Sequence, residues 1–116
     1  MKNEEALPYN NELTALCYTV KKHIEEKNYK ESLSLIQSAI AVYPHAPEPH
    51  NLMGILLENQ GNHLLAMKHF RAAWALDPTY IPAKYNMNQY TEMFITKRKD
   101  MYLPEDYSNS KEEAEK

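Results

Sequence analysis

Residues that interrupt helices recur along this chain at an interval of 34. Pro78 follows Pro44 at that distance, and Asn62 follows Asn28. Residues between these breaks align at the same offset, in the pairs Ala39 and Ala73, Ile36 and Phe70, Val42 and Leu76, Met53 and Met87, and Ile55 and Gln89. A fixed period of this length, with two helical segments in each unit, predicts a repeat architecture in which successive units stack.

Apolar residues recur with helical spacing in five segments of the chain. The predicted helices cover residues 12–26, 30–42, 48–60, 63–76 and 81–98. In the last of them the apolar positions are Tyr85, Met87, Tyr90, Met93 and Phe94. The connections are short, so successive helices should run antiparallel. The chain has only two glycines, which disfavours a fold rich in tight hairpin turns. We therefore expect an all-α fold.

One segment carries a pattern that resembles a known repeat family. Residues 47–80 contain His50-x₂-Met53-Gly54-x₂-Leu57, then Ala66-x₃-Phe70, then Pro78. This order is similar to that of the tetratricopeptide repeat (TPR), in which W-x₂-L-G-x₂-Y is followed by A-x₃-F and a proline. Residues 13–46 resemble a second, weaker copy that keeps Tyr29, Ala39 and Pro44.

The resemblance implies a right-handed α-solenoid of antiparallel helix pairs with about five helices. Residues 13–46 and 47–80 would be the two repeats, and residues 81–99 a capping helix. We expect residues 1–12 to be a partly ordered or capping N-terminal segment and residues 100–116 to be an acidic, disordered tail.

Gly54 lies well inside a predicted helix, where glycine costs about 1 kcal/mol relative to alanine. In a TPR-like repeat, Gly54 and Ala66 would mark the place where the two helices cross closely, and that packing would compensate for the cost. The first copy has Val20 and Ser32 at these places, which predicts a wider crossing. Gly61 is expected to end its helix in a left-handed conformation.

Length and charge exclude several classes of protein. A chain of 116 residues is expected to form one domain. Residues 1–103 carry 11 acidic and 11 basic side chains, so they lack the basic patch typical of nucleic-acid binding. No apolar run is long enough to be a secretory signal or to span a membrane. The single cysteine, Cys17, suits a reducing compartment, and we expect a cytoplasmic protein.

The sequence offers no arrangement of residues that points to catalysis. The five histidines, at positions 23, 45, 50, 63 and 69, include no pair three or four residues apart, so no metal site is predicted. There is no glycine-rich phosphate loop and no G-x-S-x-G motif. Cys17 is expected to be an inert thiol. We therefore predict no enzyme activity and no cofactor.

Stacked helix pairs form a concave surface lined by the first helix of each repeat. In TPR proteins that surface commonly takes a peptide or a partner's helix. The positions that the resemblance assigns to this groove are Cys17, Lys21, Ile24, Asn51, Ile55, Glu58, Tyr85, Gln89 and Glu92. Chaperone-binding TPR domains hold a carboxylate with Lys, Asn and Arg side chains. The corresponding residues here are Cys17, Lys21, Leu52, Pro82 and Asn86, and none matches in type, so capture of chaperone tails is not expected.

The leading hypothesis is a non-catalytic interaction module that binds a peptide or helix segment of an unidentified partner protein. Nucleic acid and membrane are not expected as partners. The alternative is a structural domain that self-associates, as a homodimer, with a groove that is not a ligand site. The alternative arises because Leu16, Val20 and Ile24 lie near an end with no preceding repeat, and residues 1–11 or a second chain are the two candidates to cover that end.

Overall fold

The computed structural model describes residues 8–101, with side chains described for residues 12–96. Five helices make up almost all of this part of the chain, and it contains no strand, which confirms the all-α prediction. The helices are α2 (Pro8–Glu25), α3 (Tyr29–Val42), α4 (Pro47–Asn59), α5 (His63–Leu76) and α6 (Ile81–Met101). The predicted tail, residues 100–116, lies almost wholly outside the described residues, as do residues 1–7.

The helix bounds agree with the sequence expectation to within one residue, except at the beginning of α2 and the end of α6. Helix α2 begins four residues earlier than predicted, at Pro8. A proline is tolerated at the first helical position because its missing N–H would have no partner there. Helix α6 continues to Met101, beyond the predicted end at residue 98.

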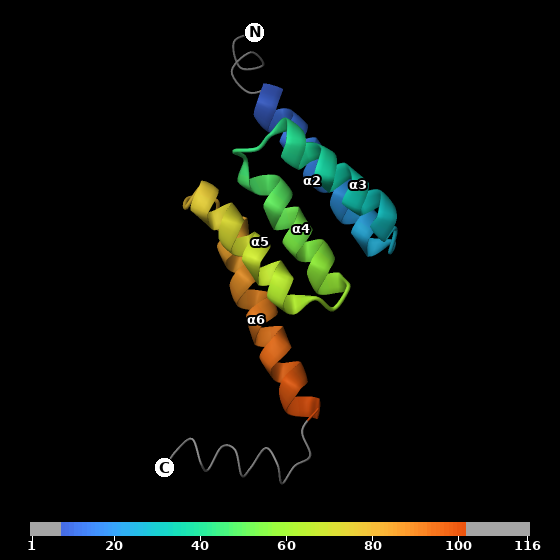
Figure 1. Ribbon diagram of the computed structural model, residues 1–116, viewed down its shortest axis with the longest axis vertical. Coiled ribbons are helices and arrows are strands. Elements are labelled where there is room, and N and C mark those ends of the chain that lie inside the picture. The colour runs from blue at the N-terminus through green and yellow to red at the C-terminus, as the bar shows by residue number, and fades with distance from the viewer. Residues whose placement is uncertain (1–7, 102–116) are drawn as a thin grey trace.

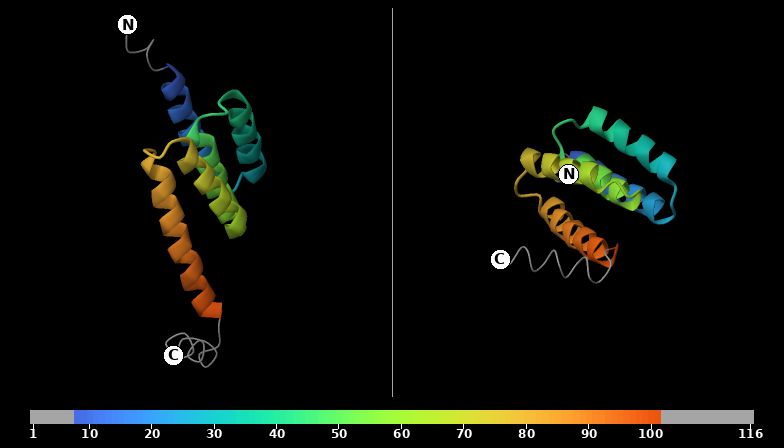
Figure 2. Two further views of the ribbon diagram at one scale, coloured as in Figure 1. Left: turned by 60° about the vertical axis from the view of Figure 1, so that its left-hand side comes forward. Right: turned by 60° about the horizontal axis from the view of Figure 1, so that its bottom comes forward.

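Successive helices alternate in direction, and α4 lies at the centre (Figure 1). Helix α4 contacts α2, α3, α5 and α6. Helices α2 and α3 form one hairpin, which lies beside the hairpin of α4 and α5 (Figures 1 and 2). Helix α6 packs along α5 and extends beyond the ends of the two hairpins (Figures 1 and 2). The central position of α4 explains why its buried residues outnumber those of α3 and α5.

The 34-residue period reappears in the backbone. Helices α3 and α5 begin 34 residues apart, at Tyr29 and His63, and end 34 residues apart. The ends of α2 and α4 also correspond. Lys27 has a φ of 64° and Gly61 has a φ of 82°. Each left-handed residue is followed by an asparagine whose N–H donates to a carbonyl five residues earlier, Asn28 to His23 at 2.8 Å and Asn62 to Leu57 at 2.8 Å. Both helices therefore end in a Schellman motif.

The two hairpins differ in how they fill the space at their crossing. A Cβ built on Gly54 would lie 2.4 Å from Cε1 of Phe70, so the Phe70 ring occupies the space of a side chain. At the equivalent places in the first hairpin, Val20 and Ile36 are both fully buried in one cluster with Leu52. Val20 is larger than the equivalent Gly54, and its partner Ile36 is smaller than the equivalent Phe70.

The chain covers its own first hairpin. Val20 and Ile24 are 0% and 4% exposed, and they pack against residues of α3 and α4. Leu16 is half-buried against the same cluster. Helices α3 and α4 therefore already bury Val20 and Ile24, so these two side chains need neither residues 1–11 nor a second chain to cover them.

Three ring contacts fasten α6 to α5. The α6 residues Met87, Tyr90 and Phe94 are half-buried, whereas Tyr85 and Met93, expected on the same apolar stripe, are exposed. The ring contacts are Phe70 with Tyr90 at 5.9 Å, His63 with Phe94 at 4.0 Å, and the Lys84 ammonium over the Trp74 ring at 4.8 Å.

We expect Gly54→Ala to lower the free energy of unfolding by about 1–3 kcal/mol, because the new methyl group overpacks against the fully buried Phe70 ring. This loss should outweigh the gain of about 1 kcal/mol in helix propensity. Chemical denaturation measures the change. Adding Phe70→Leu should make the double variant less destabilised than the sum of the two single changes. A Gly54→Ala protein more stable than wild type would contradict the crossing.

Lys27→Gly should raise the free energy of unfolding by about 0.5–1 kcal/mol, because glycine adopts the left-handed conformation without steric cost. The matched control is Gly61→Lys, which puts lysine at the equivalent position, where nothing lies within 4 Å of an added Cβ. That change should lower stability by a similar amount. If both substitutions raise, or both lower, the free energy of unfolding, backbone strain does not determine the effect of either one.

Candidate functional site

A groove of about 770 Å³ lies between α2, α4 and the beginning of α6. Its lining residues are Cys17, Lys21, Ile24, Glu25, Asn51, Leu52, Ile55, Asn59, Tyr80, Ile81, Pro82, Tyr85, Asn86 and Tyr90. Helix α4 supplies the middle of the groove, and α2 and α6 stand on either side of it. The surface is mainly apolar, with amides and tyrosines along it.

Six of the nine sequence-predicted residues line this groove. They are Cys17, Lys21, Ile24, Asn51, Ile55 and Tyr85. Gln89 and Glu92 instead line a separate hollow of about 510 Å³, together with Asn88 and Tyr85. Glu58 lines neither, because its carboxylate is paired with His63.

The groove side of α6 follows a different register from the predicted one. Pro82, Asn86 and Tyr90, each four residues apart, line the groove, whereas Tyr85 borders both hollows. On α4 the residue at the far end is Asn59 rather than Glu58. Asn59, Asn86 and Tyr90 each follow a predicted groove residue by one position, so the same helical spacing shifted by one residue would have predicted them. Nothing in the sequence fixes how α6 is rotated about its axis.

A pair of amides joins the middle of the groove to its α6 side. Asn86 Nδ2 donates to Asn51 Oδ1 at 3.1 Å, and Asn51 is only 5% exposed. The Asn51 amide also interacts with the hydroxyl of Tyr80, the pKa of which burial raises well above its usual value. Asn51 was expected to face a ligand, but its main contacts are within the protein, and they position Asn86 and Tyr80.

Cys17 is a protonated thiol at neutral pH. Burial raises its pKa to about 11; the nearby charge of Glu48 acts in the same direction, and Lys21 opposes it. Thiolate is the reactive form of cysteine, so a side chain with this pKa is a weak nucleophile. The Cys17 side chain contributes a small apolar surface to the groove wall.

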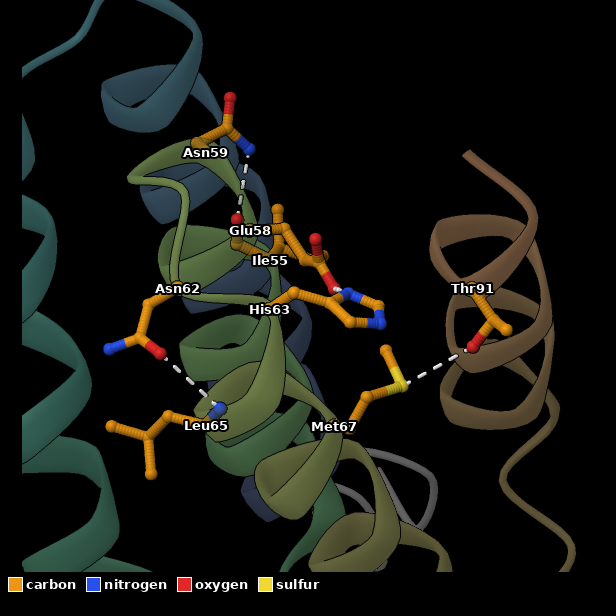
Figure 3. A network of polar contacts seen from close by, with 8 residues as sticks. All are labelled: Ile55, Glu58, Asn59, Asn62, His63, Leu65, Met67 and Thr91. Carbon is orange, nitrogen blue, oxygen red and sulfur yellow. Dashed lines mark hydrogen bonds and ion pairs between the residues drawn. The ribbon is translucent and has the colours of Figure 1, made fainter. Parts of the chain in front are cut away.

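Glu58 and His63 belong to a contact network that joins the α4–α5 turn to α6 (Figure 3). Glu58 Oε2 lies 2.6 Å from His63 Nδ1, and the His63 ring stacks on Phe94. Below it, Thr91 Oγ1 donates to Met67 Sδ at 3.4 Å. Burial raises the pKa of Glu58, and the hydrogen bond to His63 opposes that rise. These contacts stabilise the position of α6 rather than offer a ligand site.

Two histidines that are 19 residues apart in the sequence meet between α4 and α5. His50 Nδ1 and His69 Nδ1 lie 3.1 Å apart, with ring centroids at 5.3 Å. An N–H···N bond at this distance requires one donor and one acceptor nitrogen. Helical spacing cannot predict this pair, because the crossing of two helices creates it. Within residues 12–96, no group of three His, Cys, Asp or Glu side chains could hold a metal ion.

Comparison with known proteins finds no matching family model, no matching curated protein and no matching solved structure. None of the described helices combines the length and the apolar character needed to cross a bilayer.

Acid should destabilise the protein through the His50–His69 pair. Burial lowers the pKa of both imidazoles from 6.5, and the charge of His50 lowers that of His69 further. The unfolded chain therefore binds more protons near pH 6, so the free energy of unfolding should fall as the pH drops from about 7.5 to about 5.5.

Urea denaturation at the two pH values measures this fall. His69→Gln should remove much of the pH dependence, whereas His45→Gln, at an exposed position, should leave it intact. An equal pH dependence in wild type and His69→Gln would contradict the assignment to this pair.

Proposed function

We propose that the chain is a non-catalytic interaction module with a TPR-like solenoid architecture, which binds a peptide or helix segment of a partner protein in the groove between α2, α4 and α6. The groove itself carries this proposal. It combines a buried, hydrogen-bonded support with exposed side chains at its edge, the arrangement expected of a preformed binding surface. Tyr85 is 62% exposed at that edge, and a tyrosine of this kind offers both ring and hydroxyl to a partner.

The TPR-like architecture is supported by the equivalence of residues 34 positions apart. The helix bounds and the left-handed residues at 27 and 61 follow that period. The non-catalytic assignment is supported by the protonated Cys17 thiol and by the structural pairing of Glu58 with His63. A reducing cytoplasm suits the free thiol.

Selection from a library of random peptides displayed on phage tests the proposal. Wild type should enrich a set of related peptides, and Tyr85→Ala should lose at least about tenfold in affinity for them, because it removes an exposed aromatic anchor. The matched control is Tyr18→Ala, a change at a tyrosine that is 78% exposed and lies outside the groove.

Neither substitution should change the melting temperature appreciably, since both side chains are exposed. Asn51→Ala is unsuitable for this purpose, because it would break the buried amide pair. If none of the selected peptides loses affinity with Tyr85→Ala, the groove is not the binding face. If light scattering shows that wild type is a dimer and that Tyr85→Ala is a monomer, the self-associating alternative is supported instead.

A further inference from the structure

We propose that the groove takes an uncharged, proline-containing segment of a partner in the extended polyproline II conformation. This inference rests on the proposed function and names the chemistry of the occupant. Four properties of the groove lead to it, and they concern reach, charge, hydrogen bonding and aromatic surface.

The described helices place the groove beyond useful reach of residues 102–116. From Tyr85 to the end of α6 at Met101 is 16 residues, or about 24 Å of helix. A returning chain would need about seven residues to cover that distance. The residues left over, from about 110 onward, read SKEEAEK and contain one apolar residue, Ala114. They have nothing to bury on Ile24 or Ile55, so the proposed occupant is a segment of a partner rather than residues 110–116.

The groove carries no net charge. Lys21 and Glu25 are its two charged side chains, and both belong to the exposed side of α2. Cys17 and Tyr80 stay protonated at neutral pH, since burial raises the pKa of each. An acidic or a basic peptide would meet as much repulsion as attraction. Charge complementarity therefore selects an uncharged segment.

The polar groups of the groove favour an extended backbone over a helix. Asn59 Nδ2 donates to the carbonyl of Ile55 at 2.9 Å and Asn86 Nδ2 donates to Asn51 Oδ1 at 3.1 Å. Each amide has a second N–H, which needs an acceptor when an occupant excludes water from it. A docked helix presents an apolar face, and its backbone groups are already bonded to one another. A polyproline II segment has no internal hydrogen bonds, so its carbonyls are free to accept from these donors.

Tyrosine rings give the preference for proline. Tyr80, Tyr85 and Tyr90 all line the α6 side of the groove, beside Ile81 and Pro82. The Tyr90 ring is held in place by stacking on Phe70 at 5.9 Å, and Tyr80 is half-buried. Aromatic walls with hydrogen-bond donors are the common means of binding polyproline II segments, which lose little entropy on binding.

A titration of the ¹⁵N-labelled chain with a blocked peptide of Pro-Pro-Ala repeats tests the inference. Binding should shift the side-chain amides of Asn86 and Asn51 and the backbone amides around Tyr85. Tyr85→Ala should weaken binding at least about tenfold, and Tyr85→Phe less, because the ring remains. Tyr18→Ala should bind as wild type does. A peptide with alanine in place of every proline should bind at least about tenfold more weakly.

Several outcomes would overturn the inference. One is absence of binding up to about 1 mM peptide, and another is equal binding of the all-alanine peptide. Shifts confined to residues outside the groove would also overturn it. If phage selection finds Tyr85-dependent peptides that are helical or charged, the proposed function stands and the proline preference falls. If dilution alone shifts the groove amides, a second copy of the chain is the occupant, and both proposals fail.

Discussion

The contact between Gly54 and the Phe70 ring is the constraint on which the rest of the structure depends. Without a side chain at position 54, the ring lies where a Cβ would be, and α4 and α5 cross closely. The same ring stacks on Tyr90, a residue of α6 that lines the groove. A single fully buried side chain thus connects the crossing of one hairpin to the position of the terminal helix. The cost of glycine in a helix is offset by packing that reaches across three helices.

The groove has a buried support and an exposed edge, and the two have different roles. Asn51 and Asn86 bond to each other across α4 and α6, and Asn51 also contacts Tyr80. Because these groups are partnered within the chain, they fix where α6 lies relative to α4 before any ligand arrives. Tyr85 and Lys21 are exposed, so they are free to contact a ligand. A partner therefore meets a surface whose geometry is already set, which reduces the entropy lost on binding.

The sequence predicts the helices well because proline and asparagine mark their ends in both copies. It predicts the groove residues of α2 more accurately than those of α6, because a helix with no following partner can rotate without breaking the 34-residue pattern. Gln89 and Glu92 consequently lie outside the groove. The His50–His69 contact could not be predicted, since it depends on a crossing between α4 and α5 rather than on spacing within either helix. The left-handed conformation of Lys27 was equally hidden, because lysine gives no signal for it.

Lys27 and Gly61 indicate how strongly tertiary packing governs the two hairpins. Lysine accepts the left-handed conformation although it costs about 1–2 kcal/mol. The Schellman hydrogen bonds and the burial of Val20 and Ile24 just before it hold the turn in place. Since packing can impose this turn on an unsuitable residue, the two hairpins can end alike although their sequences differ at this position. Residues 13–46 therefore form a hairpin whose helix ends correspond to those of residues 47–80 without glycine at position 27.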